Sequence, residues 1–102
     1  MRSSREDALN MMKGLKEESK FVRLVANIGE FEISIDGRVS DVSDRLEVRG
    51  RGCRASIPLS DAVTFEYLEP RDFPPNFEER IFSSFWTVTD VAGSCVIAEF
   101  RR

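Results

Sequence analysis

Apolar side chains recur at every second position from Phe21 to Tyr67, and small turn residues interrupt this pattern at short intervals. A period of two places alternate side chains on opposite faces of a strand, so each run predicts a strand with one buried and one solvated face. Consecutive runs of this kind predict a meander of antiparallel strands over residues 21–68. The predicted inward rows are Val22, Leu24, Ala26 and Ile28; Phe31, Ile33 and Ile35; Leu46 and Val48; Cys53, Ala55, Ile57 and Leu59; and Val63, Phe65 and Tyr67.

Glycine-containing turns divide this meander. Residues 27–29 and 50–52 each predict a turn. Asp36-Gly37 tolerates positive φ and therefore favours a two-residue hairpin. The alternative is a bend inside one long strand, because glycine in a strand often marks a bulge or corner. Pro58 predicts a strand end or an edge position.

The N-terminal segment predicts a helix over residues 4–20. Ser4 is a suitable N-cap, with Asp7 three residues later. Apolar residues follow at helical spacing and form one stripe that we expect to cover a sheet face or an open barrel end. The stripe consists of Ala8, Met11, Met12 and Leu15.

Residues 69–80 predict an extended, proline-rich connection, because Pro70, Pro74 and Pro75 cannot lie in a sheet interior. Phe73 and Phe77 within it are expected to pack on the core. Residues 81–102 then predict a C-terminal β-hairpin in which both faces are fairly apolar. Such a hairpin is either sandwiched between the barrel and the helix or meets another subunit with one face.

Length and composition place the chain in one domain, residues 1–102, with 41% hydrophobic and 32% charged residues. The predicted fold is mainly β (α+β), an N-terminal helix packed on a small antiparallel β-barrel or bent sheet of five to seven strands. No apolar run approaches the roughly 20 residues of a membrane span. The charged N-terminus does not resemble a secretory signal, so a cytoplasmic protein is expected.

Side chains that catalyse reactions or bind metal are scarce. The chain has no histidine, and Cys53 and Cys95 predict two reduced, partly buried thiols. The aspartates of the predicted turns are expected to bond their own backbone. We therefore predict no enzymatic activity, no cofactor and no metal site. These aspartates are Asp36, Asp41, Asp44, Asp61 and Asp90.

Arginines on one strand give the best candidate site. Arg45, Arg49 and Arg51 share strand parity with Glu47, so three guanidinium groups could line one solvated face and bind an anionic ligand. An ordinary solvated face is the alternative. The net charge of −3 argues against a nucleic-acid partner.

The order of three segments resembles the layout of PilZ domains, which are six-stranded barrels that bind an anionic nucleotide. These segments are residues 37–43, residues 85–90 and residues 95–100. Asp41 and Ser43 match the first two positions of the family's Asp-x-Ser motif, and Leu46 stands where that motif has Gly. The resemblance implies a ligand held by Arg45, Arg49 and Arg51, with Asp41 and Ser43 orienting the loop.

Residues 4–68 resemble Sm-like barrels, in which a helix precedes a five-strand meander. That resemblance implies an RNA-binding module. Together these patterns predict a non-enzymatic binding or interaction domain of the bacterial cytoplasm. Its expected partner is a second copy of itself or another protein.

Overall fold

The structure is a computed structural model that describes residues 2–3, 5–75, 77–90 and 93–101. It contains one α-helix packed on a single antiparallel sheet, which confirms the predicted mainly β class. The elements are β1 (Arg2–Ser3), α1 (Arg5–Glu17), β2 (Phe21–Ile28), β3 (Phe31–Val42), β4 (Arg45–Gly50), β5 (Cys53–Pro58), β6 (Thr64–Leu68), the 3₁₀ turn η1 (Pro70–Asp72), β7 (Phe82–Asp90) and β8 (Gly93–Phe100).

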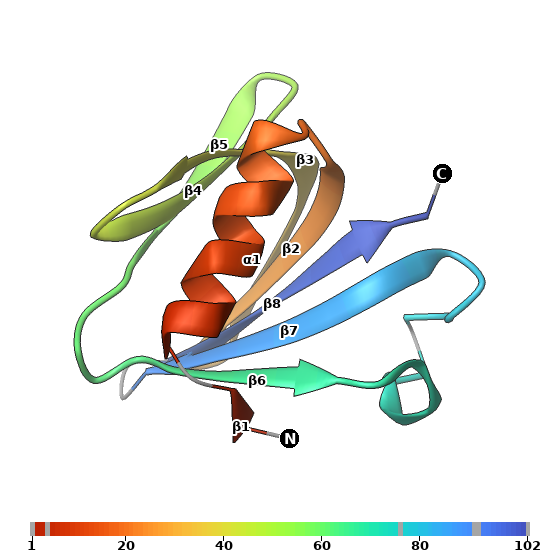
Figure 1. The fold of residues 1–102 in the computed structure, drawn as a ribbon. Coiled ribbons are helices and arrows are strands. Elements are labelled where there is room, and N and C mark those ends of the chain that lie inside the picture. Colours follow the sequence, from red (N-terminus) through yellow and green to blue (C-terminus); the bar gives the residue numbers. More distant parts are fainter. Residues whose placement is uncertain (1, 4, 76, 91–92, 102) are drawn as a thin grey trace.

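The strands lie in the order β1-β6-β7-β8-β2-β3-β4-β5. The two-residue β1 adds a short edge to a sheet of seven longer strands. No ladder in the described part of the chain joins β5 to β1 or β6, so the sheet is bent but not closed into a barrel. Figure 1 shows the sheet curling around one side of α1.

Helix α1 buries Ala8, Met12 and Leu15, whereas Met11, which we expected in the same stripe, is 44% exposed. The helix ends at Glu17, before the predicted residue 20, because Ser19 adopts a left-handed φ of 52°. The Lys20 amide donates to the Leu15 carbonyl and the Ser19 amide to the Lys16 carbonyl, which is the hydrogen-bond pattern of a Schellman motif. The predicted N-cap, Ser4, lies outside the described residues.

The start of α1 is tied to the loop between β5 and β6. The guanidinium of Arg5 donates to the carbonyl oxygens of Leu59 and Ser60, at 2.6 and 2.7 Å. The helix packs on β3 and β6, and its apolar residues join the main core on the concave side of the sheet. No helix among the described residues is long and apolar enough to cross a membrane.

The Asp36-Gly37 hairpin prediction is wrong, and the alternative of a bent strand is correct. Strand β3 runs unbroken through Gly37, pairing with β2 up to Arg38 and with β4 from Arg38 onward. A Cβ on Gly37 would lie 2.1 Å from the carbonyl oxygen of Arg49. Glycine is needed here because the two backbones approach closely, not because the residue takes a positive φ.

The predicted meander is too long by one strand. Strands β2 to β5 are consecutive neighbours, but β6 pairs with β7 and β1. Pro58 ends β5, and the following loop crosses to the far edge of the sheet with Leu59 and Val63 buried in the main core. The five-strand meander implied by the Sm-like resemblance is thus four strands and a crossing loop.

A second core lies on the convex face of the sheet. Phe82, Phe85 and Ala98 of the β7–β8 hairpin are buried there against Phe77 and the partly buried Phe73. The rings of Phe77 and Phe85 meet edge to face, with centroids 5.0 Å apart. The predicted core role of Phe73 and Phe77 is therefore confirmed.

Different parts of the protein pack on the two apolar faces of the C-terminal hairpin. Trp86 and Ile97 face the main core, while Phe82 and Phe85 lie under the proline-rich connection. We expected either a barrel-and-helix sandwich or a second subunit. The connection itself covers the convex face instead, because its two phenylalanines reach the hairpin.

Candidate functional site

The residues predicted to bind an anion are divided between the two ends of β4. Arg45 begins β4 after the β3–β4 turn, with Asp41 at the end of β3 and Ser43 in the turn, whereas Arg49 and Arg51 lie beside and within the β4–β5 turn. Arg45 and Arg49 both point to the convex side, about 13 Å apart along an extended strand. The PilZ-like set therefore does not converge on one point.

The Asp41 and Ser43 pair has a local structural role. The Ser43 hydroxyl donates to Asp41 Oδ2 at 3.0 Å and to Asp44 Oδ1 at 3.2 Å. The Ser43 amide bonds the Arg45 carbonyl across the same turn. This is the turn chemistry that short polar side chains commonly supply.

Three arginines instead form a row across neighbouring strands. The ladder register places Arg38 directly opposite Arg49, and Arg49 directly opposite Arg54. All three are exposed on the convex face. We call Arg38, Arg49 and Arg54 the arginine row.

The sequence pattern pointed to Arg49 but missed its two neighbours. Arg54 could have been found, because a two-residue turn between Gly50 and Cys53 fixes it opposite Arg49. Arg38 could not, since its position depends on β3 continuing through Gly37.

One partly buried carboxylate, Glu47, lies beside the arginine row. It accepts hydrogen bonds from Arg49 Nε and from the Ser40 hydroxyl, both at 2.8 Å, and Arg54 Nη1 lies 3.9 Å from its other oxygen. The hydrogen bond from Arg49, followed by that from Ser40, lowers the pKa of Glu47. The carboxylate is thus held ionised beside two guanidinium groups.

The β4–β5 turn adds an open hollow next to the row. Arg49 and Arg54 line it together with Gly50, Gly52 and Cys53. Gly52 takes a φ of 71°, which glycine adopts without strain and which closes the turn. Cys53 is exposed here, contrary to the expected partly buried thiol.

A different, apolar surface lies where β2 ends and β3 begins. Ile28, Phe31 and Ile33 are 55, 77 and 56% exposed. We predicted Phe31 and Ile33 as inward-facing, and they do share a face with the buried Ile35. They are exposed because no element of the described chain covers this part of the concave face.

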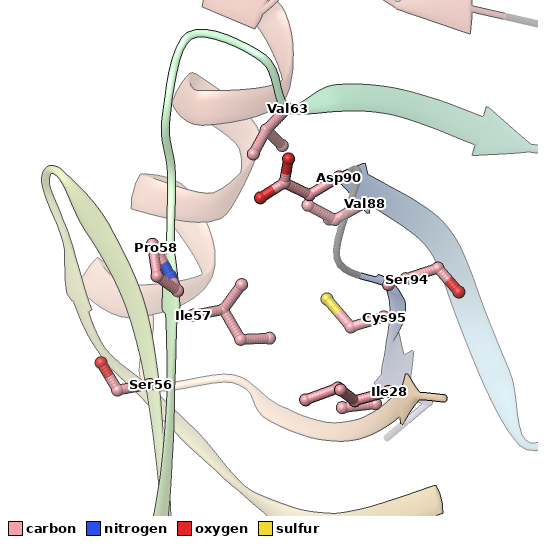
Figure 2. A pocket seen from close by; sticks show the side chains of 11 residues that line it. Ile28, Ser56, Ile57, Pro58, Val63, Val88, Asp90, Ser94 and Cys95 are labelled. Carbon is pink, nitrogen blue, oxygen red and sulfur yellow. The ribbon is translucent and has the colours of Figure 1, made fainter. Parts of the chain in front are cut away.

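An apolar cavity of about 140 Å³ adjoins these residues. Figure 2 shows it between β5 and the loop after it on one side and the ends of β2, β7 and β8 on the other. Phe31 lies opposite Ile28 in the ladder, and Ile28 lines the cavity. The lining residues are Ala26, Ile28, Ser56, Ile57, Pro58, Val63, Val88, Asp90, Gly93, Ser94 and Cys95.

The cavity offers little chemistry. Burial raises the pKa of the Cys95 thiol to about 12, so this sulfur stays protonated at neutral pH and is a poor nucleophile. Nor do the described residues gather three or more cysteine, aspartate or glutamate side chains that could hold a metal ion. The cavity is suited to holding an apolar group.

The chain thus presents two candidate surfaces on opposite faces of β3. The arginine row lies on the convex face near the bend at Gly37. The apolar surface of Ile28, Phe31 and Ile33, with the adjoining cavity, lies on the concave face where β3 begins. No protein-family model, curated protein or solved structure matches the chain.

Proposed function

We propose that the chain is a non-enzymatic interaction domain that binds a second copy of itself through Ile28, Phe31, Ile33 and the adjoining cavity. The observation that carries this proposal is the 77% exposure of Phe31 beside two other exposed apolar side chains. A contiguous apolar patch of this kind commonly marks a protein contact, because its exposure to water is unfavourable.

The patch has the features that a two-fold interface requires. Such an interface uses the same surface on both subunits, so that surface must contain both the protruding and the receiving group. Phe31 protrudes, and the cavity beside its neighbour Ile28 is apolar and open. Phe31 of each copy can therefore enter the cavity of the other.

The backbone of β3 also favours a second copy of the chain as the partner. The ladder to β2 pairs Phe31 and its next neighbours on one side only, and no strand of the described chain pairs with their other side. An unpaired edge is a template for a further strand. Antiparallel pairing of this segment with its own copy is two-fold symmetric, which brings the two Phe31 side chains into one interface.

The arrangement of apolar and polar groups is also that of a dimer interface. A standard interface buries about 800 Å² on each partner around an apolar centre with a polar rim. Here the exposed apolar side chains would form the centre. Ser56, Asp90 and Ser94 at the cavity provide polar groups around it.

Sedimentation equilibrium of the full chain tests this proposal, over about 1 μM to 1 mM to cover weak dimers. The wild type is expected to dimerise, and Phe31→Ser to weaken the dimer at least about tenfold. Because Phe31 is exposed, that variant should keep its fold. Met11→Ser, which removes another exposed apolar side chain on α1, is the matched control and should dimerise like the wild type.

Three results would overturn the proposal. The first is a wild type that stays monomeric over the whole range. The second is unchanged dimerisation by Phe31→Ser. The third is equal weakening by Met11→Ser, which would place the interface elsewhere.

A further inference from the structure

We propose that the arginine row is a binding site for a compact polyphosphate group. This site is separate from the proposed dimer surface, since its side chains project from the opposite face of the sheet. The inference rests on the register of three strands, on the hydrogen bonds of the arginines and on the hollow at the β4–β5 turn.

The first observation is electrostatic. Residues directly opposite in an antiparallel ladder have Cβ atoms about 5 Å apart, and like charges in such pairs destabilise the sheet. Arg38, Arg49 and Arg54 form two such pairs in succession. Among the described residues, Glu47 is the only carboxylate that forms ion pairs with the row, to Arg49 and Arg54, so the row keeps a net positive charge. An anion of several charges would relieve the remaining repulsion.

The second observation is that two of these arginines are held through Nε. Arg49 Nε donates to Glu47, and Arg38 Nε donates to the Ser19 carbonyl at 3.2 Å, with its guanidinium over the ring of Phe21. These contacts fix the direction of each guanidinium before a ligand arrives. The guanidinium of Arg49 stays beside Glu47, whereas that of Arg38 lies toward Phe21 on β2, at the far end of the row from the hollow. The described chain shows no hydrogen bond from the Nη atoms of either residue, and these donors suit bidentate binding of phosphate oxygens.

The third observation is the hollow beside the row. Arg49 and Arg54 line it together with Gly50 and Gly52, and a Cβ at Gly52 would meet nothing within 4 Å, so the backbone of the turn is open there. Arg51 stands exposed in the turn between those glycines, so this turn carries a further positive charge. Guanidinium groups around a glycine-lined hollow favour an anion that is both small and highly charged.

The surroundings select a compact ligand over a long polyanion. Asp41 lies near the row on β3, and the chain has a net charge of −3, whereas the nearby Asp36 is paired with Arg23 through hydrogen bonds of 2.7 and 3.0 Å. A nucleic-acid strand leaving the hollow would meet this negative field. A diphosphate or triphosphate group would instead place its charge beside Arg49 and Arg54, at the hollow that both line.

Isothermal titration calorimetry of the full chain with inorganic tripolyphosphate tests the inference. We expect saturable binding that weakens as salt rises, because screening reduces the attraction between exposed charges. Arg49→Gln and Arg54→Gln should each reduce affinity about tenfold or more. Arg45→Gln is the matched control, since it removes an exposed arginine from the same strand outside the row, and should leave affinity unchanged.

Glu47→Gln provides a readout that a merely structural role of the arginines would not give. Glutamine keeps an oxygen that can accept from Arg49 Nε but removes the competing negative charge, so tripolyphosphate should bind more tightly to this variant. Citrate, a compact tricarboxylate, should bind more weakly than tripolyphosphate to the wild type. The inference is overturned by an absence of heat with the wild type, by unchanged affinity in Arg49→Gln, by equal loss in Arg45→Gln, by no gain in Glu47→Gln, or by equal binding of citrate.

Discussion

A Cβ atom on Gly37 would lie 2.1 Å from the carbonyl oxygen of Arg49, far inside van der Waals contact. This approach of two backbones occurs where β3 changes its pairing partner from β2 to β4. Glycine at this point therefore allows one long strand to bend and carry β4 and β5 over the helix. The position of Arg49, and with it the arginine row, depends on the same contact.

Replacing Gly37 by alanine should destabilise the protein by about 3 kcal/mol, because the backbone of β3 or β4 must move to admit the methyl group. Urea unfolding followed by circular dichroism measures this loss. Gly14→Ala is the control, since a Cβ at Gly14 meets nothing within 4 Å. It should stabilise α1 by about 0.5 to 1 kcal/mol. Equal effects of the two substitutions would contradict the bend at Gly37.

Much of this fold could be predicted from local patterns. The period of two identified most strands, because one face of each is buried, and Phe73 and Phe77 indicated that the connection packs on the core. The Asp36-Gly37 hairpin prediction is wrong because tolerance of positive φ is only one reason for glycine in a strand. Close backbone approach is another, and it depends on a distant residue, Arg49, that local sequence does not identify.

Periodicity also overestimates the extent of the core. Phe31, Ile33 and Ile35 share one face, but only Ile35 is buried. Alternation reports which side of a strand is apolar and not whether a second layer covers it. The covered part of this face depends on where α1 and the loop after β5 lie against the sheet. Both positions are set by tertiary packing.

The candidate site shows the same limit. Strand parity correctly placed Arg45 and Arg49 on a solvated face, since parity depends only on neighbours in one strand. The arginine row also depends on the pairing of three strands. That pairing follows from the bend at Gly37, so Arg38 was beyond the reach of local patterns.

Phe77 should contribute to stability as strongly as a residue of the main core, although it lies in a proline-rich connection. It is 5% exposed and contacts the rings of Phe82 and Phe85. Phe77→Ala should therefore cost about 3 to 5 kcal/mol in urea unfolding. Ile81→Ala, at a nearby apolar residue that is 41% exposed, should cost much less. If both variants lost the same small amount, the second core would not be an integral part of the fold.

Glu47 should make the stability of the protein sensitive to acid. The hydrogen bonds from Arg49 and Ser40 lower its pKa in the folded state below the ordinary value of 4.5. A carboxyl group with a lowered folded pKa stabilises the fold above its unfolded pKa, and this contribution is lost as the pH falls through the folded value. The difference in unfolding free energy between the wild type and Glu47→Gln should therefore be constant near neutral pH and shrink below about pH 4.5.

Urea unfolding at pH 7 and pH 3 measures that difference, and an NMR titration of the Glu47 carboxyl reports its pKa directly. Arg49→Gln removes the first of the two hydrogen bonds and should raise the pKa of Glu47 toward its ordinary value. Arg45→Gln, with an exposed arginine at the other end of β4, should leave it unchanged. A pKa of Glu47 that did not respond to Arg49→Gln would show that Arg49 does not hold this carboxylate. In that case the preset direction of the Arg49 guanidinium, on which polyphosphate binding depends, would also be wrong.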